Sequence, residues 1–141
     1  GDNWLVSAVS FTGAENLREV LSQYGVGERV IITQVVPELD ASLPIVKKAR
    51  KALGSRFNLV SLEGYIVGKM FVSIMRNING ELTRGAFVRA ARDSEFTVGG
   101  LNLDFQDDNQ GSDLVSITYL QGGEYKTVTP SEFASLLAPA S

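Results

Sequence analysis

A turn between an apolar run and a helical pattern holds the residues with the clearest capacity for chemistry, which are Ser10, Phe11, Thr12 and Gly13. The first N–H groups of a helix carry a partial positive charge, so this turn could accept an anion such as a carboxylate at Gly13 and at the hydroxyls of Ser10 and Thr12. Phe11 would form an apolar wall beside it. In the alternative, purely structural interpretation, Thr12 caps the helix and Glu15 completes a capping box. The residues alone leave both interpretations open.

The sequence contains no histidine and no cysteine. Ser-His-Asp and Cys-His mechanisms need an imidazole or a thiolate, and haem ligation and the usual zinc sites need the same groups. The chain also shows no isolated pair of carboxylates suited to hydrolysis and no glycine-rich phosphate loop. We therefore expect no catalytic residues, no cofactor and no metal, and we interpret the chain as a protein that is not an enzyme.

An acidic cluster raises calcium binding as an alternative, and its members are Asp104, Asp107, Asp108 and Asp113. The spacing lacks the alternating ligands and the distal bidentate glutamate of an EF-hand loop. Solvated turns commonly have this composition, so a polar turn is the favoured interpretation of this segment.

The charge balance argues against nucleic acid as a partner. The 141 residues include 13 basic and 16 acidic side chains, for a net charge of −3. The few clustered cations, from Lys47 to Lys51, share a predicted helix with an apolar side and are typical of a solvated face.

The apolar stretch from Leu59 to Ile78 contains Glu63, Lys69 and Arg76, which are too costly for a span within lipid.

The elements that must position the turn follow an α/β pattern. The run from Arg29 to Pro37 is rich in β-branched residues and is followed by helical patterning, which predicts a strand buried on both faces. The run from Trp4 to Ser10 predicts a second strand, which leads into a helix that ends at Gly25. Together these segments predict a β-α-β unit with a parallel pair, so that a helix start lies beside the carboxyl end of a strand, where α/β sheets bind small ligands.

Four further helices are predicted. One begins at Pro44 and stops near Gly54, and another extends from Thr83 to about Arg92. The longest covers about Ser61 to Asn77, and its apolar residues occupy more than half of its circumference, which favours a central position. Within it, Gly64 and Gly68 would let another element come close. The last follows a capping box at Thr129-Pro130-Ser131-Glu132 and ends near Leu137.

The second half of the chain shifts towards strand patterning. Residues 96–105 predict one strand with a bend at Gly99-Gly100. Two more strands, over 114–120 and 125–128, are separated by Gly122-Gly123, which predicts a hairpin.

Five segments, taken in order, resemble the later part of a type I periplasmic solute-binding protein, closest to the branched-chain amino acid (Leu/Ile/Val-binding-like) family of ABC-transporter receptors. These segments are Val6–Gly13, Thr33–Pro37, Leu62–Tyr65, Gly99-Gly100 and Asp104-Phe105. The segment Gly80–Phe87 also resembles the helix that precedes the final strands of the family. Members of the family are much longer than this chain, so the resemblance implies a fragment or a reduced relative.

The resemblance implies an α/β, type I periplasmic-binding-protein-like fold, present as a fragment with a parallel β-α-β unit, helices and a C-terminal β-hairpin. Residues 1–35 and 114–141 would belong to the second lobe and residues 36–113 to the first, with the ligand between the two lobes. By matching position, the turn from Ser10 to Gly13 would line the cleft from the second lobe. Gln34 and Tyr65 are weaker candidates for ligand contact.

The implied function is that of the solute-binding component of an ABC transporter for amino acids or similar small carboxylates, with a membrane permease as partner. The implied location is periplasmic or extracellular, and because no signal peptide precedes Gly1 we expect a mature form or a piece of one. The missing portion of the protein, or a second copy, would cover exposed apolar surface. A ligand-sensing domain of a membrane kinase or chemoreceptor is the alternative.

Overall fold

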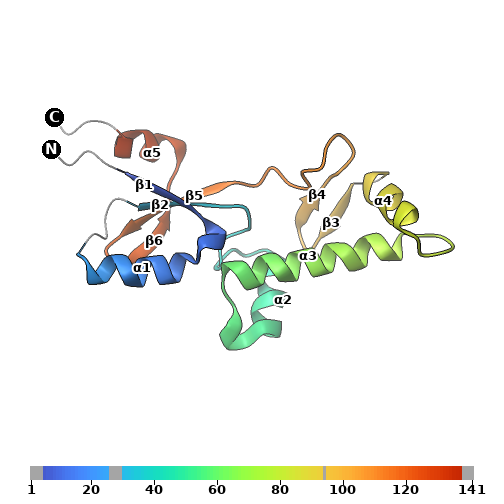
Figure 1. The fold of residues 1–141 in the computed structure, drawn as a ribbon, viewed down its shortest axis with the longest axis horizontal. Coiled ribbons are helices and arrows are strands. Elements are labelled where there is room, and N and C mark those ends of the chain that lie inside the picture. The colour runs from blue at the N-terminus through green and yellow to red at the C-terminus, as the bar shows by residue number, and fades with distance from the viewer. Residues whose placement is uncertain (1–4, 26–29, 94, 138–141) are drawn as a thin grey trace. The chain divides into compact units, whose positions relative to one another are not determined.

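The chain divides into two compact units in the computed structural model, which describes residues 5–25, 30–93 and 95–137 (Figure 1). Unit 1 combines Gly1–Pro37 with Leu114–Ser141, and unit 2 is Glu38–Asp113. Trp4 and Arg29, which the sequence places in predicted strands, lie outside the described residues. The assignment of these parts to two lobes of a receptor stays a prediction.

Unit 1 is built on a four-stranded sheet in the order β1-β2-β5-β6. Its strands are β1 (Val6–Val9), β2 (Val30–Gln34), β5 (Ser116–Gln121) and β6 (Glu124–Thr127). The first two strands pair in parallel, with Val6 opposite Val30, and the remaining pairs are antiparallel. Helix α1 (Ala14–Gln23) connects β1 to β2, so the predicted parallel β-α-β unit is confirmed.

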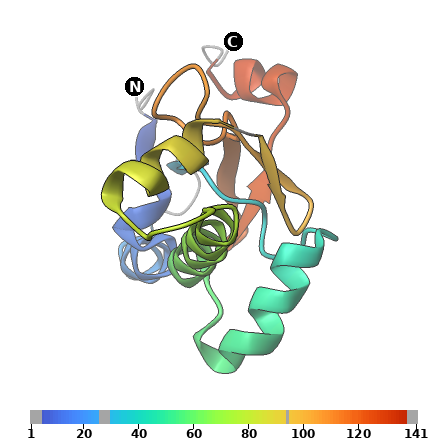
Figure 2. The same cartoon turned by 90° about the vertical axis from the view of Figure 1, so that its right-hand side faces the viewer.

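The core of unit 1 forms on β2 because this strand has a neighbour on either side. Val30, Ile31 and Ile32 are buried, as predicted for a strand covered on both faces. Helices α1 and α5 (Pro130–Leu137) lie on opposite sides of the sheet (Figures 1 and 2). The phenol of Tyr125 on β6 donates a hydrogen bond of 2.8 Å to the carbonyl of Ala14, which fixes the start of α1 over the sheet.

Two diglycine turns close hairpins in the two units. Gly122 and Gly123, with φ of 60° and 81°, join β5 to β6 as predicted. Gly99 and Gly100 also have positive φ, 57° and 90°, but the predicted single bent strand is wrong: the chain reverses into β3 (Phe96–Val98) and β4 (Leu101–Leu103). Two consecutive residues in the left-handed region reverse the chain in a type I′ hairpin turn instead of bending it.

Unit 2 packs this β3-β4 hairpin with α2 (Pro44–Leu53), α3 (Leu59–Arg76) and α4 (Arg84–Arg92). The amide of Ile45 donates to the carbonyl of Gly99 at 2.9 Å, so the hairpin turn seats on the start of α2. The most deeply buried apolar residues of the unit are Ile45, Val46, Ala49, Leu62 and Ile74.

Helix α3 lies between α2 and α4, as the end-on view in Figure 2 shows. This central position agrees with its apolar sequence, but only Leu62, Ile66 and Ile74 are buried on it. A Cβ built on Gly64 or Gly68 would meet no atom within 4 Å, so the predicted close approach of another element is not present among the described residues. No helix in the described part of the chain has the length and apolarity needed to cross a membrane.

Local capping fixes where three of the helices begin. The amide of Thr129 donates to the Glu132 carboxylate at 2.7 Å, and the amide of Glu132 donates back to the Thr129 hydroxyl at 3.3 Å, so the predicted capping box of α5 is confirmed. Asn58 and Ser61 form a second box before α3, which therefore begins two residues earlier than predicted. The hydroxyl of Thr83 accepts from Ala86 at the start of α4.

The capping box of α5 predicts that the stability of this helix depends on pH. Hydrogen bonds from the Thr129 amide, and secondly from its hydroxyl, lower the pKa of Glu132 below 4.5. A carboxyl group with a depressed folded-state pKa stabilises the fold above its unfolded pKa, and this contribution disappears as the pH falls through the folded pKa. We expect α5 to lose helicity over that acidic range. A carbon-detected NMR titration of Glu132 measures this pKa. Thr129→Val should raise the pKa only part of the way to its ordinary value, because the hydrogen bond from the backbone amide of residue 129 remains. An unchanged pKa in that variant would contradict the role of the hydroxyl.

The two diglycine turns make a matched pair for a stability test. Gly99→Ala and Gly122→Ala place a side chain at nearly the same φ, 57° and 60°, which costs about 1 kcal/mol each. A Cβ at position 99 would lie 2.8 Å from Cβ of Ile45, whereas one at position 122 meets nothing within 4 Å. We expect Gly99→Ala to lower the free energy of unfolding by at least about 1 kcal/mol more than Gly122→Ala. Urea denaturation measures both, and equal losses would disprove the close seating of this turn.

Candidate functional site

The strand-end turn of unit 1 is the first part of the candidate site. After β1, Ser10–Thr12 form a single 3₁₀ turn, and Gly13 then adopts a φ of +80° before α1 begins. Ser10 is 4% exposed, whereas Phe11 is 74% exposed. Gly13 is the N-cap residue of α1, a position at which it offers no side chain to the helix amides.

The predicted capping box at Thr12 and Glu15 is wrong. The Thr12 hydroxyl donates to the carbonyl of Val9 at 2.7 Å, and the carboxylate of Glu15 forms an ion pair of 2.7 Å with Arg18. Because the 3₁₀ turn delays the helix by one residue, Thr12 stands outside the N-cap position. Among the described residues no side chain caps α1, so the positive end of this helix lacks the internal acceptor that the structural interpretation required.

The second part of the site is Gln34, the last residue of β2, which is 5% exposed. Its side-chain amide nitrogen donates to the Thr118 hydroxyl at 3.2 Å, and that hydroxyl donates to the carbonyl of Ile32 at 3.3 Å. The amide oxygen of Gln34 and the hydroxyl of Ser116, its partner in the strand register, are buried without a hydrogen bond. Buried polar atoms are nearly always paired, so these two mark a place where hydrogen-bonding capacity is unused.

The parallel register brings these two parts to the same edge of the sheet. Val9 lies opposite Thr33, and the next residues along the two strands are Ser10 and Gln34, both buried. The carboxyl ends of β1 and β2 therefore hold a buried hydroxyl, a buried amide with a free acceptor, and a helix start that no side chain caps. This combination can bind a small molecule that carries both an anionic group and N–H or O–H groups.

Tyr65, the remaining predicted site residue, is on α3 and belongs to unit 2. It is half-buried, and the ammonium of Lys69 lies 5.5 Å from the centre of its ring. The structure gathers Ser10 to Gly13 and Gln34 within unit 1, and a ligand contact of Tyr65 in unit 2 stays a prediction.

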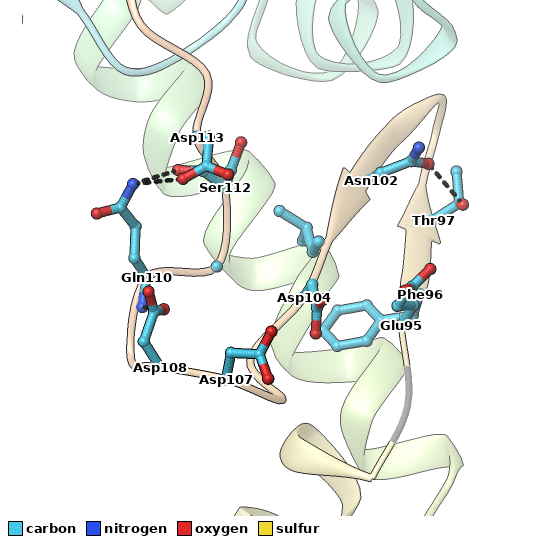
Figure 3. A pocket seen from close by; sticks show the side chains of 12 residues that line it. Glu95, Phe96, Thr97, Asn102, Asp104, Asp107, Asp108, Gln110, Ser112 and Asp113 are labelled. Carbon is cyan, nitrogen blue, oxygen red and sulfur yellow. Dashed lines mark hydrogen bonds between the residues drawn. The ribbon is translucent and has the colours of Figure 1, made fainter.

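Unit 2 contains a separate hollow of about 680 Å³ along the β3-β4 hairpin and the loop that follows it (Figure 3). Its lining includes the acidic cluster noted in the sequence. Asp104 and Asp108 each accept the backbone amide two residues later, and Asp113 accepts from the side chain of Gln110 at 2.9 Å. These carboxylates thus shape the polar turn. The described residues contain no group of three acidic side chains placed to hold a metal ion.

This chain is similar to several solved structures, two of which are described as ligand-binding proteins. A possible leucine/isoleucine/valine-binding protein from Rhodopirellula baltica SH 1 has 31% sequence identity and a TM-score of 0.74, over 95% of this chain and 37% of that one. An extracellular ligand-binding receptor from Verminephrobacter eiseniae ef01-2 has 23% identity and a TM-score of 0.75, over 88% and 38% of the two chains. A chain from Rhodospirillum rubrum has 16% identity and a TM-score of 0.61, over 91% and 38%. No family model and no curated protein matches the sequence.

The last two structures are similar in fold alone, whereas the first is also similar in sequence over nearly the whole of this chain. The chain spans less than two fifths of the length of each of them. The first two are described as binding or receptor proteins and not as enzymes. The resemblance predicted from the sequence is confirmed: in sequence and in fold, this chain matches part of a type I periplasmic solute-binding protein of the branched-chain amino acid (Leu/Ile/Val-binding-like) family.

Proposed function

We propose that this chain is part of the solute-binding component of an ABC transporter, and that it contributes one side of a site for an amino acid or a similar small carboxylate. The observation that carries the proposal is the edge of unit 1 where an uncapped helix start lies beside Ser10 and Gln34. The sequence similarity to a possible leucine/isoleucine/valine-binding protein supports the same assignment.

The chemistry of this edge suits a carboxylate first. The amides at the start of α1 have no side-chain acceptor among the described residues, and the helix dipole favours negative charge at that end. The exposed ring of Phe11 lies within the same turn and offers apolar surface for an aliphatic side chain. An amino acid presents a carboxylate and an apolar side chain from one carbon atom, so both features of the turn can act on one ligand.

Gln34 would supply the second polar contact. Its free amide oxygen is an acceptor, which suits the ammonium group of an amino acid. Since this oxygen is closed off from solvent, the side chain of Gln34 or its surroundings must move for a ligand to reach it. A ligand that donates to this oxygen would satisfy a buried acceptor, whose lack of a partner costs about 1–3 kcal/mol.

Binding without turnover fits the residues present, because the described edge holds hydroxyls, amides and an aromatic ring and no nucleophile paired with a base. The remainder of the receptor would close over the ligand by a hinge and deliver it to a membrane permease outside the cytoplasm. A sensor domain of a membrane kinase or chemoreceptor would use the same ligand contacts and differ only in the partner it addresses.

A ligand titration followed by NMR tests the proposed site directly. Because the chain supplies one side of the cleft, we expect affinity for L-leucine on the order of millimolar. Backbone amide shifts of residues 10–15 and 34 should move and saturate, while those of α4 in unit 2 stay constant. Leucinamide, which lacks the carboxylate, and 4-methylpentanoate, which lacks the ammonium, separate the two polar contacts. Equal shifts with leucine and leucinamide would refute carboxylate binding at the start of α1.

Replacing Gln34 by leucine separates a binding role from a structural one. Gln34→Leu removes one hydrogen bond to Thr118 but also removes the unpaired oxygen, so we expect the free energy of unfolding to change by less than about 1.5 kcal/mol. The leucine-dependent shifts should nevertheless weaken several-fold. Gln121→Leu, the same substitution at an exposed position of β5, is the control and should leave them unchanged. A large loss of stability with normal ligand shifts would assign Gln34 to the core alone.

A further inference from the structure

Positive charge in this chain is concentrated in one segment of unit 2. Residues 41–62 contain five basic side chains and no acidic one. The rest of the chain contains the other 8 of the 13 basic side chains and all 16 acidic ones, so it has a net charge of −8, against −3 for the whole chain. This segment therefore has a field opposite in sign to that of the remaining chain.

Helix α2 places four of these basic residues on one side. At about 100° per residue they fall within an arc of about 160° that contains no acidic side chain, and all four are exposed. The opposite side of the helix is fixed in the core of unit 2 by Ile45, Val46 and Ala49, which are at most 1% exposed. The exposed arc, which we call the cationic face of α2, consists of Lys47, Lys48, Arg50 and Lys51.

The three lysines of the cationic face have no partner among the described residues. Their ammonium groups form no hydrogen bond and no ion pair there. Arg50 differs, because it donates to the carbonyl of Leu39 and lies 4.6 Å from the centre of the Phe57 ring. Exposed helices often intersperse charges of both signs, which form salt bridges along the helix. A face with positive charge alone leaves three ammonium groups to water or to an external anion.

A solvated face, the interpretation that the sequence favours, explains only part of this arrangement. Basic residues in the last turn of a helix interact favourably with its dipole, which accounts for Arg50 and Lys51. Lys47 lies four residues before Lys51, and like charges at this spacing destabilise a helix. Helix α2 therefore contains a repulsion that an uncharged residue at position 47 would remove. An anionic surface in contact with the face would also offset it.

The residue types of the face favour a layer of phosphate groups over a protein surface. Protein interfaces are enriched in arginine and aromatic residues and depleted in lysine. The one arginine of the face is held by Leu39 and Phe57, and no aromatic side chain belongs to the face. Lysine binds phosphate as a point charge with three rotatable donors. Exposed lysines spread over more than one turn of a helix contact several phosphate groups more readily than they enclose one anion.

We infer that the cationic face of α2 binds the anionic headgroups of a phospholipid membrane by electrostatic attraction. The helix cannot insert its apolar side, because Ile45, Val46 and Ala49 already pack in unit 2. The acidic remainder of the chain is repelled by the same membrane, so the attraction selects an orientation with α2 towards the lipid. The inference rests on the proposed function only in placing the chain outside the cytoplasm beside a membrane, and it involves none of the residues of the candidate site.

Vesicle co-sedimentation tests the inference with the complete 141-residue chain. We expect binding to vesicles of phosphatidylglycerol and phosphatidylcholine at about 0.1 M salt, and none to vesicles of phosphatidylcholine alone. Raising the salt to about 1 M, which shortens the Debye length from about 10 to 3 Å, should abolish the binding. Lys47→Gln combined with Lys51→Gln should weaken the affinity at least about tenfold, since each lysine near such a surface contributes about fivefold.

The control is Lys69→Gln combined with Lys126→Gln, which replaces the two lysines outside the segment and changes the net charge equally. This variant should change the affinity by less than about twofold, because at about 0.1 M salt charges far from the contact are screened. Circular dichroism should show that both double variants keep their helices, because all four lysines are exposed. The lipid and salt comparisons use the unchanged chain and depend on no variant.

Absence of binding to anionic vesicles, equal binding to neutral ones, or equal weakening by the two double variants would overturn the inference. Inorganic phosphate that shifts the α2 amides while vesicles stay unbound would assign the face to a free anion instead. Tighter binding to a DNA duplex at equal phosphate concentration would assign it to nucleic acid.

Leucine-dependent shifts of residues 10–15, measured without vesicles, keep this inference apart from the proposed function. Their absence with vesicle binding intact would refute the proposed function alone. Their presence without vesicle binding would refute the membrane surface alone.

Discussion

The parallel pairing of β1 with β2 is the constraint on which the candidate site depends. Parallel neighbours need a crossover, and the crossover here contains α1, so the helix must start at the edge where both strands end. This arrangement places the uncapped amides of α1 beside Ser10 and Gln34 without any special contact to hold them there. The hydrogen bond from Tyr125 to the carbonyl of Ala14 then fixes the helix start against the antiparallel part of the sheet.

The elements that follow local rules could be predicted from the sequence. The β-branched run before Pro37, the glycine after α1 and the capping box at Thr129 each act within a few residues, and the structure agrees with them. The failures also have physical causes. Thr12 is a good N-cap residue, but a 3₁₀ turn shifts the helix start past it. The Gly99-Gly100 pair bends or reverses a chain depending on what it packs against, and its contact with Ile45 comes from a helix some 50 residues earlier.

The site itself was only partly predictable for the same reason. The turn from Ser10 to Gly13 can be identified from the sequence because it lies between a predicted strand and a predicted helix. The state of Gln34 does not, because its hydrogen bond to Thr118 joins residues 84 apart and its unpaired oxygen is a property of the folded sheet. The acidic cluster shows the converse case: a conspicuous sequence pattern whose carboxylates accept hydrogen bonds within their own loop. The strand-end edge and the acidic cluster therefore differ in whether their polar atoms have hydrogen-bond partners, and residue type alone does not show this difference.

The same reasoning connects the two kinds of incompleteness in this chain. Among the described residues, polar atoms at the strand ends lack partners, one edge of β1 has no neighbouring strand, and several apolar side chains of α3 are exposed. In an independent small domain each of these would oppose folding, because unpaired polar groups and exposed apolar surface both reduce stability. In the receptor that we propose, further protein would cover the apolar surfaces permanently, and the polar edge would bind a ligand reversibly. The chemistry of each surface thus fits the lifetime of the contact for which we propose it.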